Sequence, residues 1–153
     1  LNDVVLHKGG FARVVAVDVM ANGESVAHYS GDGVVLSTPT GSTAYNLSAG
    51  GPVVFPTLEV ILLAPVSAHT LALRPLVLPA SAEVSLRVDN GPRELLVTVD
   101  GQVGVSFAAG ETLLVRKADA SVPIVRFSTN SFFATMREKL HWGGLPDRDE
   151  RSP

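Results

Sequence analysis

The amino-acid sequence predicts a mainly β fold, an antiparallel β-sandwich-like domain with two short helical additions. Residues 83–88 alternate between apolar and polar side chains, which is the pattern of a strand with one buried face. The pairs Asn22-Gly23 and Asp100-Gly101 favour the positive φ angles of tight hairpin turns. Short apolar runs separated by such turns indicate a sandwich rather than alternating strands and helices.

The predicted strands follow one another at short intervals. A valine-rich run at residues 13–19 can pair with residues 25–29 across the Asn22-Gly23 turn. Residues 60–64 are continuously apolar, which favours a strand that is covered on both faces. The remaining strands are expected at residues 4–6, 34–36, 83–88, 94–99, 102–107, 113–116 and 124–127.

A polar turn after residues 34–36 is the most distinctive stretch of the chain. We expect a short helix there that starts at Ser42 and Thr43 and stops at Gly50 and Gly51. Unpaired N–H groups at a helix start favour anionic or acceptor-rich ligands, so the turn is a place to hold a nucleotide. From composition alone, an ordinary turn with a helix cap explains the stretch equally well.

A second helix is predicted at residues 131–140. Phe132, Phe133, Met136 and Leu140 fall on one face of it, which indicates a helix that docks on another surface. The glycines at positions 143 and 144 can stop it. The charged residues 147–153 have no apolar pattern, and we expect them to be mobile.

The composition excludes several classes of function. Twelve basic against fifteen acidic residues give a net charge of −3, so nucleic acid and anionic membranes are not expected partners. The sequence has no cysteine, which excludes disulfides, thiolate metal sites and a cysteine nucleophile. The four histidines show no metal-ligand spacing, and no apolar run has membrane-spanning length. We therefore expect a soluble, cytoplasmic protein without its own metal site.

Residues 30–52 carry a long motif: Ser-Gly-Asp-Gly, then Ser-Thr-Pro-Thr-Gly-Ser-Thr-Ala-Tyr, then Ser-Ala-Gly-Gly-Pro. The motif resembles the signature of the C-terminal domain of bacterial NAD kinases. Asn2-Asp3 resembles the family's Asn-Glu/Asp motif, and residues 65–79, 99–102 and 139–144 resemble further blocks. The resemblance implies an NAD-binding, all-β domain over residues 1–145 and a mobile polar tail at residues 146–153.

The catalytic loop of that family is not found in these residues. Gly31-Asp32-Gly33 is followed by valine and precedes the Thr-Pro-Thr-Gly-Ser-Thr block, so it resembles the later motif of the family. The Gly-Gly-Asp-Gly-Thr loop of the N-terminal domain, where the proposed catalytic aspartate lies, does not occur in the chain. No catalytic residue is therefore assigned, and we expect the chain alone to be inactive.

The resemblance implies an enzyme that transfers the γ-phosphoryl group of ATP, or of polyphosphate in some members, to the adenosine-ribose 2′-hydroxyl of NAD, giving NADP. It also implies Mg²⁺ with the ATP and a homo-oligomer, dimer or tetramer. Two other interpretations stay open. One is a lipid or sphingoid-base kinase of the same superfamily, and the other is a non-catalytic β-domain that senses nucleotide or mediates assembly.

Carried over by position, the family's NAD-binding residues fall into three groups. Asn2 and Asp3 would bind the adenosine ribose, since a carboxylate accepts hydrogen bonds from two vicinal hydroxyls. Asp32 would bind the nicotinamide amide, from a neighbouring subunit. The adenine pocket would be formed by Thr40, Thr43, Ala44, Tyr45 and Ser48. Without the resemblance, Asn2-Asp3 would be an ordinary polar lead-in to a strand, and Asp100 a turn residue.

Overall fold

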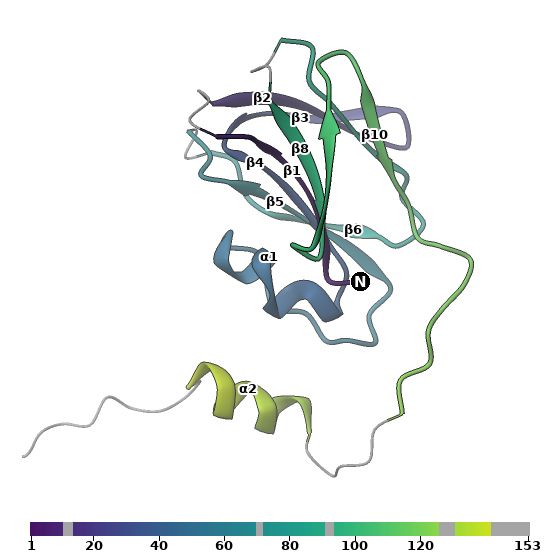
Figure 1. Ribbon diagram of the computed structural model, residues 1–153. Helices are drawn as coiled ribbons and strands as arrows, with labels where there is room; N and C mark the ends of the chain where they lie inside the picture. Colours follow the sequence, from purple (N-terminus) through teal and green to yellow (C-terminus); the bar gives the residue numbers. More distant parts are fainter. Residues whose placement is uncertain (11–13, 70–71, 91–93, 126–130, 142–153) are drawn as a thin grey trace, which may run out of the picture. The chain divides into compact units, whose positions relative to one another are not determined.

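The computed structural model describes residues 1–10, 14–69, 72–90, 94–125 and 131–141. The chain divides into two compact units, residues 1–119 and residues 120–153 (Figure 1). The first unit holds every strand of the described residues, and the second holds the longer of their helices. The predicted domain boundary at residue 145 lies outside the described residues.

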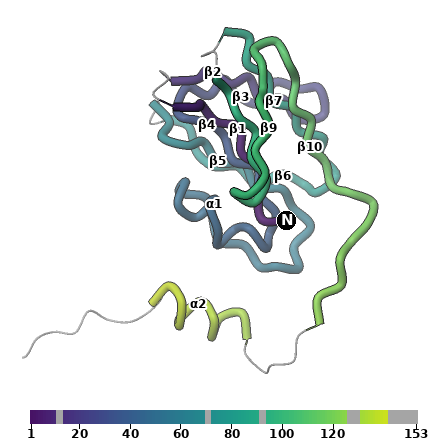
Figure 2. Tube along the Cα trace, in the orientation of Figure 1, coloured from purple at the N-terminus to yellow at the C-terminus, as the bar shows by residue number. Residues whose placement is uncertain are grey.

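Two antiparallel sheets build the first unit. Sheet A has six strands in the order β6-β5-β4-β1-β8-β9, and sheet B has four in the order β10-β7-β2-β3 (Figure 2). The strands are β1 (Asp3–Lys8), β2 (Val15–Ala21), β3 (Glu24–Gly31), β4 (Gly33–Ser37), β5 (Val60–Val66), β6 (Leu76–Pro79), β7 (Val84–Arg87), β8 (Leu95–Val99), β9 (Val103–Phe107) and β10 (Thr112–Val115). The predicted mainly β, antiparallel fold is confirmed.

The core lies between the inner faces of the two sheets. Leu6, Leu36 and Leu63 of sheet A pack in one cluster with Val17 and Leu86 of sheet B, and all five side chains are buried. Full burial of such a side chain contributes roughly 1.5–3 kcal/mol. The alternation predicted for residues 83–88 is confirmed, because Val84 and Leu86 face this core.

Sheet A is also covered on its outer face near its centre. Val5, Val35 and Ala64 form a second buried cluster, against which Ala49 and Val66 pack. The segment that follows β4 supplies Ala49, and its helix α1 (Tyr45–Ser48) lies beside the N-terminus in Figure 1. The prediction that residues 60–64 are covered on both faces is therefore confirmed, since Ile61 and Leu63 of β5 reach the core while Ala64 reaches the outer cluster.

Both predicted hairpin turns are present. Asn22 and Gly23 have φ angles of 51° and 80°, and they join β2 to β3. Asp100 and Gly101 have φ angles of 52° and 65°, and they join β8 to β9. Positive φ at both central positions is the geometry that matches the twist of the flanking strands.

Several strand predictions differ from the structure. β2 begins at Val15 and runs to Ala21, two residues later than expected at each end. β6 (Leu76–Pro79) was not predicted, because its prolines suggested turns, but an edge strand tolerates proline. Within the predicted strand at residues 124–127, Ile124 and Val125 are exposed and unpaired with any described strand. Residues 126 and 127 lie outside the described residues.

The second unit contains α2 (Phe132–Leu140), which confirms the predicted helix. The Ser131 side chain accepts a hydrogen bond from the Ala134 N–H at 3.1 Å and caps the helix. His141, in the left-handed conformation with φ 51°, ends it. The predicted glycine stop and the polar tail lie outside the described residues, and docking of the helix stays a prediction. None of the described helices has the length and apolarity to cross a membrane.

Candidate functional site

A cleft of about 520 Å³ lies over the outer face of sheet A. Val5, His7 and Thr98 form its floor, because Val5 and His7 share a face of β1 and Thr98 lies opposite Val5 on β8. Its walls come from the residues before β1, the β3–β4 corner, the start of α1, the end of β5 with Ser67, and the β8–β9 turn. These contribute Asn2, Asp32, Ala44, Tyr45, Asp100 and Gly101.

Asp100 fixes one end of the cleft. Its carboxylate Oδ1 accepts hydrogen bonds from the backbone N–H groups of Asn2, at 2.5 Å, and Asp3, at 3.1 Å. The N–H of Asp100 in turn donates to the Asp3 carbonyl oxygen at 3.0 Å. The hydrogen bond from Asn2 and then that from Asp3 lower the pKa of Asp100 below its ordinary value. Asp100 is thus both the expected turn residue and the anchor of the Asn2-Asp3 backbone.

Asp3 is a buried acid at the start of β1, with 5% of its surface exposed. Burial, followed by the nearby negative charge of Asp100, raises the pKa of Asp3, and a hydrogen bond from the Tyr45 backbone opposes this shift. The protein itself therefore offers the ionised Asp3 carboxylate too few hydrogen-bond donors and positive charges to offset its burial. A ligand that brings hydroxyl or amide donors to it would supply them.

The polar turn packs directly on the segment that carries Asn2. The Thr38 hydroxyl donates to the Leu1 carbonyl oxygen at 2.9 Å and accepts from the Gly41 N–H at 3.1 Å. The Thr38 N–H donates to the Asn2 carbonyl oxygen, also at 2.9 Å. A Cβ atom on Gly41 would lie 2.0 Å from that same Asn2 oxygen. Only glycine allows the turn to approach so closely.

The predicted helix start at Ser42 and Thr43 is wrong. A 3₁₀ helix, η1 (Thr40–Thr43), comes first, and α1 begins only at Tyr45. Ser42 is buried, and its hydroxyl accepts from the Val54 N–H at 3.3 Å instead of capping a helix. A four-residue helix has too little dipole to attract an anion, so the helix start does not support the predicted preference for anionic ligands. The predicted stop is confirmed by the Gly51 N–H, which bonds the Asn46 carbonyl at 2.8 Å.

Asn46 fixes the loop that carries α1. It is fully buried, and its amide nitrogen donates to the carbonyl oxygens of Ser42, at 3.2 Å, and Pro52, at 3.1 Å. These two bonds tie both ends of the segment together from the inside. Tyr45 is thereby held at the mouth of the cleft, with 43% of its surface exposed.

Asp32 lies at the opposite wall, where one residue joins β3 of sheet B to β4 of sheet A. Its carboxylate Oδ1 is 2.7 Å from Lys8 Nζ. The hydrogen bond from Lys8, and next that from the Ser67 side chain, lower the pKa of Asp32. Ser67 has a φ of 49°, a conformation that non-glycine residues rarely adopt and that recurs at ligand sites.

Five of the eight predicted site residues line this one cleft: Asn2, Asp3, Asp32, Ala44 and Tyr45. The other three, Thr40, Thr43 and Ser48, are exposed on η1 and α1 and do not line it. Their assignment to a binding pocket stays a prediction.

Sequence reasoning missed His7 and Lys8. The strand was expected to end at Leu6, but β1 runs to Lys8 and carries both side chains into the cleft. The missed signal is the alternation of Asp3, Val5 and His7, which share one face of a strand. His7 Nδ1 lies 2.9 Å from the Lys8 carbonyl oxygen, which can only accept, so Nδ1 carries the hydrogen of that contact.

The cleft has no ligand set for a metal. Among the residues that the structure describes, no three His, Cys, Asp or Glu side chains converge in a way that could hold an ion. Asp100 already uses its carboxylate on two backbone N–H groups. The Mg²⁺ that the resemblance implies therefore has no fitting site in the described part of this chain.

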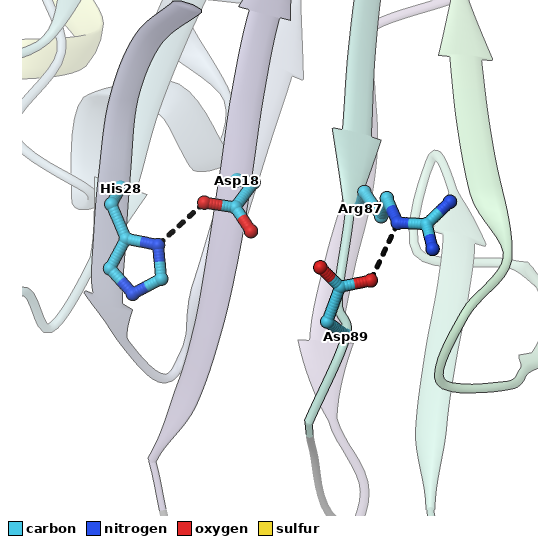
Figure 3. A network of polar contacts seen from close by, with 4 residues as sticks. All are labelled: Asp18, His28, Arg87 and Asp89. Atoms are coloured by element: carbon cyan, nitrogen blue, oxygen red, sulfur yellow. Dashed lines mark hydrogen bonds and ion pairs between the residues drawn. The ribbon is translucent and has the colours of Figure 1, made fainter.

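Sheet B carries a different set of polar contacts on its outer face. His28 Nδ1 lies 2.6 Å from Asp18 Oδ1, and Arg87 Nε lies 2.6 Å from Asp89 Oδ1 (Figure 3). All four side chains are 45% or more exposed. None of them lines the cleft.

Comparisons with known proteins agree on one family. Residues 1–127 match the model of the ATP-NAD kinase C-terminal domain. The chain is 63% identical over 149 residues to the NAD kinase of Gemmatimonas aurantiaca, covering 97% of this chain and 52% of that protein. It is 43% identical over 143 residues to the NAD kinase of Geobacter metallireducens, covering 94% and 50%. The chain thus spans about half the length of these relatives.

Solved structures give the same result. Yeast NADH kinase complexed with NADH matches with a TM-score of 0.85 and 30% identity, covering 94% of this chain and 44% of that chain. An NAD kinase from Archaeoglobus fulgidus in complex with ATP matches with a TM-score of 0.71 and 28% identity, covering 78% and 45%. From its sequence and from its fold alike, this chain belongs to the ATP-NAD kinase C-terminal domain family.

Proposed function

We propose that this chain is the NAD-binding part of an NAD kinase. The enzyme transfers the γ-phosphoryl group of ATP, or of polyphosphate, to the adenosine-ribose 2′-hydroxyl of NAD and so makes NADP. Family membership supports the reaction class. The observation that carries the proposal for this chain is the cleft, in which a buried acid, Asp3, lies beside Asn2 and Tyr45.

The ribose is bound by Asn2 and Asp3. An ionised carboxylate accepts hydrogen bonds from both hydroxyls of a ribose, and Asp3 is short of donors from the protein. The Asp100 anchor holds the backbone of both residues in place before a ligand arrives. This pre-organisation lowers the entropic cost of binding.

The adenine lies against Ala44 and Tyr45, where an exposed aromatic ring offers a stacking surface at the cleft mouth. Thr40, Thr43 and Ser48 complete the adenine pocket beyond the cleft itself. Asp32 accepts a hydrogen bond from the nicotinamide amide, either of the ligand in its own cleft or of one bound by a neighbouring subunit.

Phosphoryl transfer depends mainly on positioning and charge neutralisation. In this chain, Asp3 orients the ribose hydroxyls and the α1 segment holds the base. No group here is assigned as the general base. Mg²⁺ enters with ATP, and the described residues of this chain offer no ligand set for it. The isolated 153-residue chain is therefore expected to bind NAD weakly and to produce no NADP.

The test is an NADP-formation assay with NAD, MgATP and, separately, polyphosphate. It compares the protein expressed from its complete reading frame with the 153-residue chain alone. We expect turnover only from the complete protein, and a loss of NAD affinity in Asp3→Ala. Full turnover by the 153-residue chain would contradict its assignment as a binding part. A complete protein that neither binds NAD nor makes NADP would overturn the proposal.

The substrate class and the assembly are tested by two simpler measurements. NAD should raise the melting temperature of the complete protein, because a ligand that binds only the native state stabilises it, whereas a sphingoid base or diacylglycerol should not. We further propose a homo-oligomer, dimer or tetramer, in the cytoplasm. Sedimentation that finds only monomer at the assay concentration would remove the oligomer, and with it any contact of Asp32 across subunits.

A further inference from the structure

The charges that line the cleft are unevenly distributed. Among the described residues, three carboxylates line it, those of Asp3, Asp32 and Asp100, together with a single lysine, Lys8. Lys8 is paired with Asp32, so the negative charges of Asp3 and Asp100 lie at one end and a nearly neutral pair lies at the other.

The Lys8-Asp32 pair is held more rigidly than an ordinary surface ion pair. The Lys8 N–H donates to the Asp32 carbonyl oxygen at 3.1 Å, and the Asp32 N–H donates to the Val66 carbonyl oxygen at 2.9 Å. The two residues are thus fixed to each other by backbone as well as by side chain, and Asp32 is fixed to β5. The Ser67 side chain, on a positive-φ residue, bonds the Asp32 carboxylate as well.

The pair is nevertheless open to a ligand. The Lys8 side chain is 26% exposed and that of Asp32 is 38% exposed, and both line the cleft. A ligand group that approaches Asp32 therefore experiences the charge of Lys8 as well. In the absence of Lys8, it would meet an uncompensated carboxylate.

We propose that Lys8 is a specificity-determining positioning residue that sets the balance between oxidised and reduced dinucleotide. This rests on the proposed function, in which the nicotinamide lies at Asp32. The nicotinamide ring carries a positive charge in NAD⁺ and none in NADH. By cancelling the charge of Asp32, Lys8 removes an electrostatic preference for the oxidised ring. Because both residues belong to one chain, the pair acts as a unit whichever subunit's ligand it faces.

The experiment measures dissociation constants for NAD⁺ and NADH by calorimetry on the protein expressed from its complete reading frame. A unit charge about 6 Å from the ring, in a water-like dielectric, changes affinity about threefold. Lys8→Met should therefore shift the affinity ratio about threefold toward NAD⁺. Asp32→Asn, which leaves Lys8 uncompensated, should shift it toward NADH. The double variant should return toward the wild-type ratio, and Lys8→Arg should keep it.

Two controls separate this effect from a general loss of structure. AMP lacks the nicotinamide, so its affinity should respond to neither Lys8→Met nor Asp32→Asn. Lys117→Met removes the same charge from a similar ion pair, with Glu59, outside the cleft, and should leave the ratio unchanged. Because the Lys8-Asp32 pair is partly exposed, the shift in Lys8→Met should also shrink as salt is added.

The opposite signs make the result decisive. Ratios that move in the same direction in Lys8→Met and Asp32→Asn, or that stay at the wild-type value in both, would overturn the proposal. So would a shift of equal size in Lys117→Met. If the wild-type protein binds AMP but neither dinucleotide, the proposed function itself fails, which is a different outcome from an unchanged ratio. Should Lys8→Met fail to fold, Asp32→Asn and Lys8→Arg still give the test.

Discussion

Two polar regions of the same sandwich use hydrogen bonds in different ways. In the cleft region, the exposed Asp100 carboxylate accepts from the backbone N–H groups of Asn2 and Asp3 at 2.5 and 3.1 Å, and Asp3 itself is only 5% exposed. The sheet B pairs, Asp18 with His28 and Arg87 with Asp89, are side-chain contacts of 2.6 Å between exposed groups (Figure 3). By contact distance alone, the two regions would look alike.

The difference lies in what each contact constrains. A carboxylate that bonds the backbone N–H groups of another segment fixes the course of the chain, and such charge-assisted hydrogen bonds are stronger than neutral ones. An exposed pair of side chains exchanges its partners with water at little cost, and its net contribution is typically below about 1 kcal/mol. The polar groups that fix the backbone of another segment line the cleft in this molecule, whereas the exposed side-chain pairs of sheet B do not.

The largest effect is expected from a substitution at Gly41, where the backbone of the polar turn lies closest to Asn2. Gly41→Ala places a Cβ atom 2.0 Å from the Asn2 carbonyl oxygen, so the turn or the start of β1 must move. We expect a loss of about 3 kcal/mol in the free energy of unfolding and a loss of NAD binding. Urea unfolding and calorimetry measure the two effects.

A matched control for this substitution exists on β9. In Gly104→Ala, the nearest atom to the new Cβ is Thr98 Cγ2, at 3.9 Å, which is ordinary contact. Its free energy of unfolding should change by less than about 0.5 kcal/mol. Equal effects in the two alanine variants would break the claim that the cleft wall is unusually constrained.

The next effect tests the comparison directly, with one aspartate from each region. Asp100→Ala removes the acceptor of the Asn2 and Asp3 N–H groups and places alanine at a φ of 52°, and the two effects together should cost about 2 kcal/mol of unfolding free energy. Asp89→Ala removes an exposed ion pair and should cost less than about 0.5 kcal/mol. Chemical denaturation of both variants at neutral pH gives the comparison, and a larger cost for Asp89→Ala would reverse it.

The difference in stability between wild type and Asp100→Ala should also depend on pH. Because the folded pKa of Asp100 is lowered, its stabilisation is fully present above the ordinary value of 3.8 and is lost as the pH falls through the folded pKa. The stability difference between wild type and Asp100→Ala should therefore shrink on acidification below pH 3.8. A difference that is constant down to the lowest pH studied would show that charge is not involved.

A smaller effect of opposite sign is expected at Asp3. Its pKa is raised by burial, so its ionised form destabilises the folded state, and stability is lost as the pH rises from 3.8 through the higher folded pKa. Asp3→Asn should raise the melting temperature at pH 7 and should weaken NAD binding. Melting curves at pH 4 and pH 7 check the sign. A lower melting temperature at pH 7 would contradict the raised pKa.

The smallest effect is expected at His28. Its side chain is 62% exposed and its partner Asp18 is 45% exposed. His28→Ala should change the free energy of unfolding by less than about 0.5 kcal/mol and leave NAD affinity unaltered. A cost above about 1 kcal/mol would mean that the sheet B pairs do constrain the fold. The proposed difference between the cleft region and the sheet B pairs would then be wrong.

Local patterns predicted most of the fold. The hairpins at Asn22 and Asp100 need positive φ, and the residues that tolerate it are visible in the sequence. The continuous apolarity of residues 60–64 predicted a doubly covered strand for the same local reason. The pairing order of the strands, however, depends on contacts between segments that lie far apart in the chain, and no local pattern contains it.

The site was only partly predictable. The helix start was wrong because the Ser42 hydroxyl bonds Val54, twelve residues further on, and a tertiary contact of this kind leaves no local trace. Lys8 was missed because its role depends on Asp32, which reaches it only when β1 pairs with β4. Asp100 was expected as a turn residue for sound reasons. Its bonds to Asn2 and Asp3 appear only once β8 lies beside β1.

The single residue that joins β3 to β4 has a mechanical consequence. Gly31 belongs to sheet B and Gly33 to sheet A. Because no longer loop joins these two strands, a rotation of one sheet against the other cannot be taken up by flexible residues between them. Such a rotation of the sheets must change the backbone angles of Asp32 and move its carboxylate. Conversely, a ligand that binds this carboxylate would restrict the motion of sheet A relative to sheet B. Slower amide hydrogen exchange in β3 and β4 would then report occupancy from well outside the contact area.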